Sequence, residues 1–279
     1  IQSSIQSTAF QDSQIKNMIS KQNTVESSSH TMIKFTNFCF SYPSMPNVSV
    51  FKNLTFEVEK NEIVGIVGKS GSGKSTIASL LLMLYPIYQV KALEIKDCDI
   101  NDVGVSAIRK IISVVEQKPS FFRSSIKENL LYGCNTHTNS ETVLWELLKK
   151  LELESFVNAL PDKLDTVIDS SLISGGQAQR LSLIRSLMKK AEILVFDECT
   201  SALDATNADI IENFVTSRTE SLLNKTTRVI ITHSETMMKK CDRIIVLGGT
   251  DGVVVETGTY EELAAKKSSY FNMVLMEAA

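Results

Sequence analysis

The chain has 279 residues, of which 43% are hydrophobic and 22% charged, a composition typical of a globular protein with a large core and one or two domains. The net charge is −3, and Lys and Arg are scattered along the sequence, which disfavours a nucleic-acid-binding protein. The cysteines are odd in number, widely spaced and without a C-x-x-C pair, so we expect neither a disulfide framework nor a zinc site. No apolar run reaches the ~20 residues that a membrane-spanning helix needs, and no signal peptide is indicated.

The chain starts with a polar segment. Residues 1–30 are rich in Ser, Gln, Asn and Thr and show little apolar periodicity, so we expect a flexible linker there. Because the chain begins with Ile1 instead of Met, we expect this linker to continue from a preceding part of a longer protein. Residues 31–279 are expected to form the folded domain.

Apolar patterns in the folded domain predict two kinds of strand and a helical insertion. Alternating apolar and polar residues over 32–42 predict a half-buried strand. A second run over 51–59 and a short one at 93–95 predict further strands, so we expect a sheet that is buried on one face. Apolar runs typical of the buried strands of a parallel sheet follow at 62–67, 111–115, 193–196, 229–232 and 244–247. Helical spacing predicts an inserted helical subdomain over about 124–189, and a hairpin near 252–256 with two short helices is expected to close the chain.

Residues 68–75 match the P-loop pattern G-x-x-x-x-G-K-[ST], between a predicted strand and a helix predicted over 76–82. The glycines allow backbone N–H groups to point at phosphate oxygens, and the helix start adds its positive end. We expect Lys74 to reach the β- and γ-phosphates and the Ser75 hydroxyl to bind Mg²⁺; the alternative is a Gly/Ser-rich surface turn. The candidate nucleotide-binding residues here are Gly68, Lys69, Ser70, Gly71, Ser72, Gly73, Lys74, Ser75 and Thr76.

Two carboxylates follow the predicted strand over 193–196. In a P-loop protein an acidic residue is needed at such a strand end, so we expect Asp197 to hold Mg²⁺, directly or through water. Glu198, one residue further on, would orient and deprotonate the attacking water. The alternative is simply a polar strand end.

A second anion-binding helix start is predicted at Ser174, Gly175, Gly176 and Gln177, before a helix expected over 178–188. One chain with two phosphate-binding helix starts suggests that they serve opposite sides of a nucleotide. A Gly-Gly turn with a Ser N-cap is the alternative interpretation.

In this order, the motifs over about residues 32–276 resemble the ATP-binding cassette, the nucleotide-binding domain of ABC transporters. The resemblance implies an α/β fold: a P-loop NTPase core with a mostly parallel sheet, an antiparallel β subdomain and an inserted α-helical subdomain. It also implies that ATP and Mg²⁺ are bound, and that residues 1–30 link the cassette to a preceding membrane domain. Ser174 to Gln177 correspond to the signature motif, with Ile173 replacing its usual Leu.

The same resemblance assigns roles to further residues. Tyr42 is similar to the aromatic residue that stacks on adenine, and Gln117 to the glutamine that contacts Mg²⁺ and follows the membrane-embedded half. Ser201 and Asp204 are similar to the D-loop, and His233 to the histidine at the γ-phosphate. The implied catalytic residues are Glu198, His233 and Gln117, and the implied metal ligands are Ser75, Gln117 and Asp197.

Cassettes of this family pair head to tail, so the resemblance implies two partners. Each ATP lies between the P-loop of one cassette and the signature motif of the other, and the transmembrane domains of the same transporter bind the pair. The expected location is the cytoplasmic face of a membrane, the plasma membrane, with a soluble cassette that binds no nucleic acid. The transported peptide would contact the membrane domain only.

Finer features favour an exporter. Residues 113–119 and 126–130 follow the exporter pattern, whereas 166–173 is shorter than usual and lacks the Gly and Glu that normally touch the coupling helices, which puts that contact in doubt. The shortened segment resembles the C-terminal cassettes of yeast mating-pheromone exporters, so the expected cargo is a peptide, a lipidated pheromone. A multidrug or other peptide exporter remains an alternative. A regulatory cassette with little turnover is disfavoured because Glu198 and His233 are both present, and a soluble ABC ATPase because no coiled-coil insertion is found.

Overall fold

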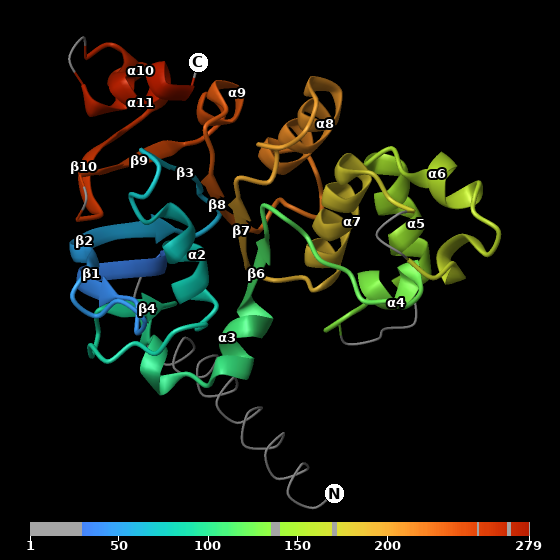
Figure 1. Cartoon of the computed structure of the whole chain (residues 1–279), viewed down its shortest axis with the longest axis horizontal. Coiled ribbons are helices and arrows are strands. Elements are labelled where there is room, and N and C mark those ends of the chain that lie inside the picture. The colour runs from blue at the N-terminus through green and yellow to red at the C-terminus, as the bar shows by residue number, and fades with distance from the viewer. Residues whose placement is uncertain (1–29, 135–139, 169–171, 250, 267–268, 279) are drawn as a thin grey trace, which may run out of the picture.

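Two β-sheets and a group of helices make up the part of the chain that the structure, a computed structural model, describes: residues 30–134, 140–168, 172–249, 251–266 and 269–278 (Figure 1). The predicted linker therefore lies outside the described residues, apart from residue 30, and so does the middle of the shortened segment. Among the helices that are described, none is both long and apolar enough to cross a membrane.

The first sheet is antiparallel, with the strand order β2-β1-β4-β5. Its strands are β1 Thr31–Ser41, β2 Ser49–Glu59, β4 Leu93–Ile95 and β5 Cys98–Asp99. Alternate apolar residues of β1 are buried, and Phe35 stacks on Phe56 of β2 with ring centroids 4.8 Å apart. This sheet is the predicted antiparallel subdomain.

The second sheet has the order β10-β9-β3-β8-β7-β6, in which every pairing is parallel except that of β10 with β9. Its strands are β3 Ile63–Gly68, β6 Ile112–Val115, β7 Ile193–Asp197, β8 Thr227–Ile231, β9 Arg243–Gly248 and β10 Val253–Gly258. All residues of β3 and β8 are buried, as expected for the centre of a sheet covered on both faces. The carboxyl ends of these parallel strands lie at one edge, where α/β proteins bind ligands.

Helices cover this sheet and form a separate group beside it. Helices α2, α3, α8 and α9 follow or precede core strands, α4 to α7 occupy the predicted insertion, and α10 and α11 close the chain. Figure 1 shows α4, α5 and α6 on the side of the core away from the antiparallel sheet. The helices are α2 Lys74–Leu81, α3 Val105–Ile111, α4 Ile126–Leu130, α5 Ser140–Lys150, α6 Glu154–Asn158, α7 Gly175–Met188, α8 Ala205–Thr216, α9 Glu235–Met238, α10 Tyr260–Ala264 and α11 Tyr270–Ala278, with short 3₁₀ turns η1 Ile100–Asp102 and η2 Lys163–Asp165.

The predicted architecture is confirmed: an α/β core with a mostly parallel sheet, an antiparallel sheet and inserted helices. Most boundaries differ by one to three residues, and three of them are informative. The helix predicted over 178–188 begins at Gly175, because Ser174 caps it, and the P-loop helix predicted from residue 76 begins at Lys74. The strand predicted from residue 111 begins at Ile112, since Ile111 ends α3.

Candidate nucleotide-binding site

The P-loop connects β3 to α2 and places Lys74 at the helix start. Gly71 and Gly73 have φ of 81° and 94°, a left-handed backbone that glycine adopts without strain. A side chain at Gly73 would also have its Cβ 2.5 Å from the Phe51 ring, so the loop needs glycine here for a second reason. The loop therefore packs tightly on β2 while its other side faces a cavity.

Lys74 is buried, with 5% of its surface exposed, and its ammonium group donates to the carbonyl oxygens of Gly68 (2.8 Å) and Lys69 (3.1 Å). Burial lowers the pKa of Lys74, while the charges of Glu198 and Asp197 act in the opposite direction. The ammonium lies 3.9 Å from a carboxylate oxygen of Glu198. Backbone carbonyls are weak partners for a cation, so this group is available to a phosphate.

Ser75 and Asp197 lie side by side: the Ser75 hydroxyl donates to Oδ1 of Asp197 over 2.9 Å. Burial raises the pKa of Asp197, and the hydrogen bond from Ser75 partly opposes that shift. Hydroxyl and carboxylate oxygens are ligands that Mg²⁺ prefers, and this ion usually takes only one or two protein ligands and completes its shell with phosphates and water. Consistently, no group of three or more His, Cys, Asp or Glu side chains among the described residues could hold a metal. The donor set fits a magnesium ion bound together with a nucleotide.

Glu198 is the centre of a polar cluster formed by three separate segments. The amide Nε2 of Gln117 donates to Oε2 of Glu198 and to the Ser201 hydroxyl, both over 3.1 Å, and Nε2 of His233 lies 3.3 Å from Oε1 of Glu198. Glu198 itself has φ of 46°, an unusual left-handed conformation for a non-glycine residue, and its N–H donates to the Ile231 carbonyl of β8. The strained backbone turns its carboxylate toward Lys74, Gln117 and His233.

A cavity of about 530 Å³ brings the P-loop and this cluster together. Its lining includes half of the residues that the sequence singles out: Tyr42, Ser70, Gly71, Gly73, Lys74, Ser75, Thr76, Gln117, Glu198 and His233. Tyr42 is fixed by a hydrogen bond of 2.7 Å between its hydroxyl and that of Thr76, and by an edge-on contact with Tyr85. Gly68 and Lys69 instead contribute carbonyl groups to Lys74, and Ser72 is buried behind the loop against Gly68.

The signature residues lie elsewhere and do not line this cavity. Ser174 caps α7: its hydroxyl accepts from the Gln177 N–H (3.3 Å), while the Ser174 N–H donates to the Gln177 side chain (2.9 Å). Ser174 and Gly175 border a second cavity of about 450 Å³, beside Phe121 and Arg123. The two predicted phosphate-binding helix starts are thus not brought together within one chain.

The two D-loop residues have different surroundings. Ser201 belongs to the Glu198 cluster, whereas Asp204 caps α8 by accepting from the N–H (3.0 Å) and the side-chain amide (2.6 Å) of Asn207. These hydrogen bonds lower the pKa of Asp204. Asn207 in turn packs on Gly176, where a Cβ would lie 2.6 Å from it, so the D-loop helix touches the start of α7.

Sequence reasoning missed three residues around the site. Val50 lines the cavity beside Gly73 of the P-loop, Asn207 joins α8 to α7, and Gln179 joins α7 to the segment that carries Gln117. Val50 carries no motif. Gln179, two residues after the signature motif, is a polar residue on a buried helix face, which is the only local signal.

Comparisons with known proteins give the family of the chain. Residues 51–201, more than half of the chain, match the family described as ABC transporter. The chain is 42% identical over 243 residues to the Alpha-factor-transporting ATPase of Saccharomyces cerevisiae, covering 87% of this chain and 18% of that protein. It is 39% identical over 245 residues to the ABC multidrug transporter mdr2 of Aspergillus fumigatus, covering 87% and 30%.

Among solved structures, the chain is similar to a bacterial Atm1-family ABC exporter with ATP bound. The TM-score is 0.78 at 30% identity, over 90% of this chain and 42% of that one. The chain thus spans less than half the length of the proteins it matches, and the resemblance to the yeast pheromone exporter is confirmed. The chain belongs to the ABC transporter family, as an ATP-binding cassette with the ABC ATPase fold.

Proposed function

We propose that this chain is the motor domain of an ABC exporter, which binds ATP with Mg²⁺ and hydrolyses it to drive efflux of a peptide across a membrane. The observation that carries the proposal is the Glu198 cluster: a carboxylate, an amide and an imidazole from three segments face one cavity with Lys74 and Ser75, and Ser75 is hydrogen-bonded to Asp197. Relatives named as an ATPase and as an ATP-dependent permease support hydrolysis.

The proposed mechanism uses the geometry of the cavity. Tyr42 would stack on adenine, and the P-loop N–H groups with Lys74 would hold the phosphates, replacing the Lys74 contacts to Gly68 and Lys69. Ser75, Asp197 and Gln117 would hold Mg²⁺, which supplies neutralisation of the phosphate charge. With Lys74 only 3.9 Å from Glu198, a γ-phosphate held by Lys74 would lie next to Glu198.

Glu198 would then accept a proton from the attacking water. Gln117 donates to one carboxylate oxygen of Glu198, which leaves the other, near Lys74 and His233, to orient the water. His233 would contact the γ-phosphate from the same side. The intact cluster favours this hydrolytic function over a regulatory cassette.

A second cassette is the first proposed partner. The signature motif of this chain lies outside its own nucleotide cavity, so the ATP held by one P-loop would be covered by Ser174 and its neighbours from another cassette. The backbone N–H groups at the start of α7 and the Ser174 hydroxyl would then meet the phosphates. ATP binding would bring the two cassettes together, and hydrolysis would release them.

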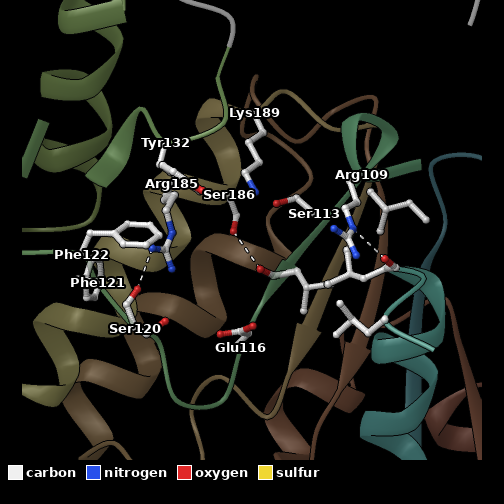
Figure 2. Close-up of a pocket in the computed structure, with 14 residues that line it drawn as sticks. Arg109, Ser113, Glu116, Ser120, Phe121, Phe122, Tyr132, Arg185, Ser186 and Lys189 are labelled. Carbon is white, nitrogen blue, oxygen red and sulfur yellow. Dashed lines mark hydrogen bonds between the residues drawn. The ribbon is translucent and has the colours of Figure 1, made fainter. Parts of the chain in front are cut away.

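The membrane domain of the same transporter is the second proposed partner, on the cytoplasmic face of the plasma membrane. A groove of about 490 Å³ between β6 and α7 contains Glu116, the residue before Gln117, and offers a docking surface (Figure 2). Arg109, Arg185 and Lys189 line the groove, and none of them forms an ion pair with another described residue. An acidic docking segment fits this charge.

The cargo is the most specific point proposed. We propose a lipidated peptide pheromone as the cargo. The similarity to the Alpha-factor-transporting ATPase supports the pheromone, and the similarity to a multidrug transporter makes drug export the second candidate.

ATPase rate against protein concentration tests the motor function, for the wild type beside Glu198→Gln. We expect the specific activity to rise with concentration, since two chains build each site, and to fall by about 10²-fold or more in the variant, the usual contribution of a general base. The variant should still bind ATP. Near-normal turnover in Glu198→Gln would exclude Glu198 as the base, and a negligible wild-type rate with tight ATP binding would favour a regulatory cassette.

A further inference from the structure

Helix α7 is joined to β6 and to the segment after it by three side chains that donate to backbone carbonyls, one to β6 and two to the segment. Gln179 Nε2 donates to the Glu116 carbonyl (2.8 Å), Arg185 to that of Ser120 (2.8 Å) and Ser186 to that of Val114 (3.3 Å). Figure 2 shows the Arg185 and Ser186 contacts from within the groove. The segment that carries Gln117 is therefore held at both ends by the helix that begins with the signature motif.

The Gln179 contact acts on the peptide group of Gln117 itself. The carbonyl of Glu116 and the N–H of Gln117 belong to one planar unit that includes the Gln117 Cα, so fixing that carbonyl fixes the Cα from which the Gln117 side chain extends and limits where its amide can reach. Gln179 is 2% exposed, and a buried amide without a hydrogen-bond partner would destabilise the fold, so this bond is expected to persist. Glu116 and Gln117 are themselves exposed, so little else in their own segment restrains them.

Gln117 needs this restraint because its amide makes two hydrogen bonds at once. Nε2 reaches both Glu198 and Ser201 over 3.1 Å, which requires a defined orientation of the side chain. Gln179 lies only five residues after Ser174, on the first turns of α7. A path of direct contacts thus runs from the signature motif through Gln179 and the 116–117 peptide to the carboxylate of Glu198.

We propose that Gln179 is a positioning residue for ATP hydrolysis: it holds the 116–117 peptide so that Gln117 meets Glu198 and ties that geometry to the signature helix. The proposal rests on the motor function above. It predicts that loss of the Gln179 donor impairs the chemical step and leaves nucleotide binding intact, because Tyr42 and the P-loop lie on other elements.

The test replaces Gln179 by Met, which keeps the length of the side chain and removes the donor, with Gln179→Leu as a second variant. Ser186→Ala is the matched control, since it removes the same kind of bond from the same helix to Val114, whose position is held by pairing with Val195 of β7. We expect kcat to fall about tenfold in the Gln179 variants with KM for ATP unchanged, and to stay within about twofold in the control.

A double-mutant cycle separates positioning from a structural role. In a Gln117→Ala background, Gln179→Met should have little further effect on kcat, since the residue through which it acts is absent. Additive losses would overturn the proposal, as would equal effects of Gln179→Met and Ser186→Ala.

Amide hydrogen exchange gives a readout that does not depend on turnover. We expect faster exchange at the amides of Gln117, Lys118 and Ser120 in the Gln179 variants and unchanged exchange there in Ser186→Ala. If the wild type does not hydrolyse ATP but this contrast is found, the motor function fails and the positioning stands. Unchanged exchange in the Gln179 variants would overturn the positioning, whatever the turnover.

Discussion

Asp197 lies at the end of β7 in surroundings that favour its neutral form. Burial is the largest effect on this carboxyl group and raises its pKa above the value of an unfolded chain. A carboxyl group shifted in this direction contributes stability that is fully present below its unfolded pKa and is lost as the pH rises through its folded pKa. At neutral pH the nucleotide-free protein therefore holds the charge of Asp197 at a cost in stability, which a bound Mg²⁺ would remove.

Asp197→Asn should separate stability from function. Without nucleotide, we expect the melting temperature at pH 7.5 to rise by about 2 °C, because the buried charge is gone and the amide oxygen still accepts from Ser75. In the wild type, ATP with Mg²⁺ should raise the melting temperature more than ATP with EDTA does. In Asp197→Asn this difference should disappear. Thermal denaturation under these conditions measures both effects.

Glu198→Gln is the matched control for this experiment, since it also neutralises a carboxylate of the cavity. Glu198 makes no contact with Ser75, and we expect its variant to keep the Mg²⁺-dependent stabilisation. A lower melting temperature for Asp197→Asn without nucleotide would contradict the argument from burial.

At the scale of the element, the two glycines that begin α7 have different surroundings. A Cβ on Gly176 would lie 2.6 Å from the Asn207 side chain, whereas a Cβ on Gly175 would meet no atom within 4 Å. Gly176 thus lets α7 pack on α8, while Gly175 leaves a clear surface beside the helix start. That surface is the one proposed to meet the ATP of a second cassette.

Alanine at each position should separate packing from dimer contact. We expect Gly176→Ala to destabilise the isolated chain by about 1–2 kcal/mol, because overpacking outweighs the gain in helix propensity. Gly175→Ala should leave the unfolding free energy of the monomer unchanged or slightly higher and weaken the ATP-driven dimer. Urea denaturation measures the unfolding free energy, and size-exclusion chromatography with ATP measures dimer formation. Equal destabilisation by both variants would contradict the prediction.

The same helix illustrates what sequence patterns reveal and what they miss. The buried strands and the P-loop are local features, since their apolar runs and glycine spacing need no distant residue, and they were predicted correctly. The start of α7 was placed three residues late because glycine is a poor helix former, although Ser174 and Gln177 form a capping box around the two glycines. Helices α3 and α8 were not predicted, being short or flanked by loop-like residues.

Within the candidate site, the sequence predicts the residues that belong to motifs but not the side chains that hold them in position. Lys74, Ser75, Asp197 and Glu198 belong to recognisable patterns. Gln179 and Glu116 are separated by 63 residues, and their contact exists only because α7 packs beside β6. No local pattern encodes such an approach, so side chains that orient the functional residues could be assigned only from the fold.

At the scale of the whole molecule, the residues proposed for the two halves of a nucleotide site lie apart on one chain. Lys74 and Glu198 lie 3.9 Å apart on one face of the cavity, while Ser174 borders a different cavity on the same chain. A twofold, head-to-tail pair would form two sites, each from the P-loop half of one chain and the signature half of the other. Defects in opposite halves should then complement one another.

Mixing two inactive variants tests this geometry. Lys74→Ala disables the P-loop half and Ser174→Arg the signature half, so each variant alone forms pairs without an intact site. In a mixed pair both defects fall in one site and the other site is intact. Random pairing makes about half of the dimers mixed, so an equal mixture should recover about a quarter of the wild-type ATPase rate if the sites act independently.

Lys74→Ala mixed with Glu198→Gln is the matched control. Both defects lie in the P-loop half, so a mixed pair places one defect in each site and no site is intact. We expect this mixture to stay inactive. Recovery in both mixtures would mean that Lys74 and Glu198 do not serve the same site. Recovery in neither, with an active wild type, would contradict the head-to-tail pair, because the first mixture must contain an intact site whenever such pairs form.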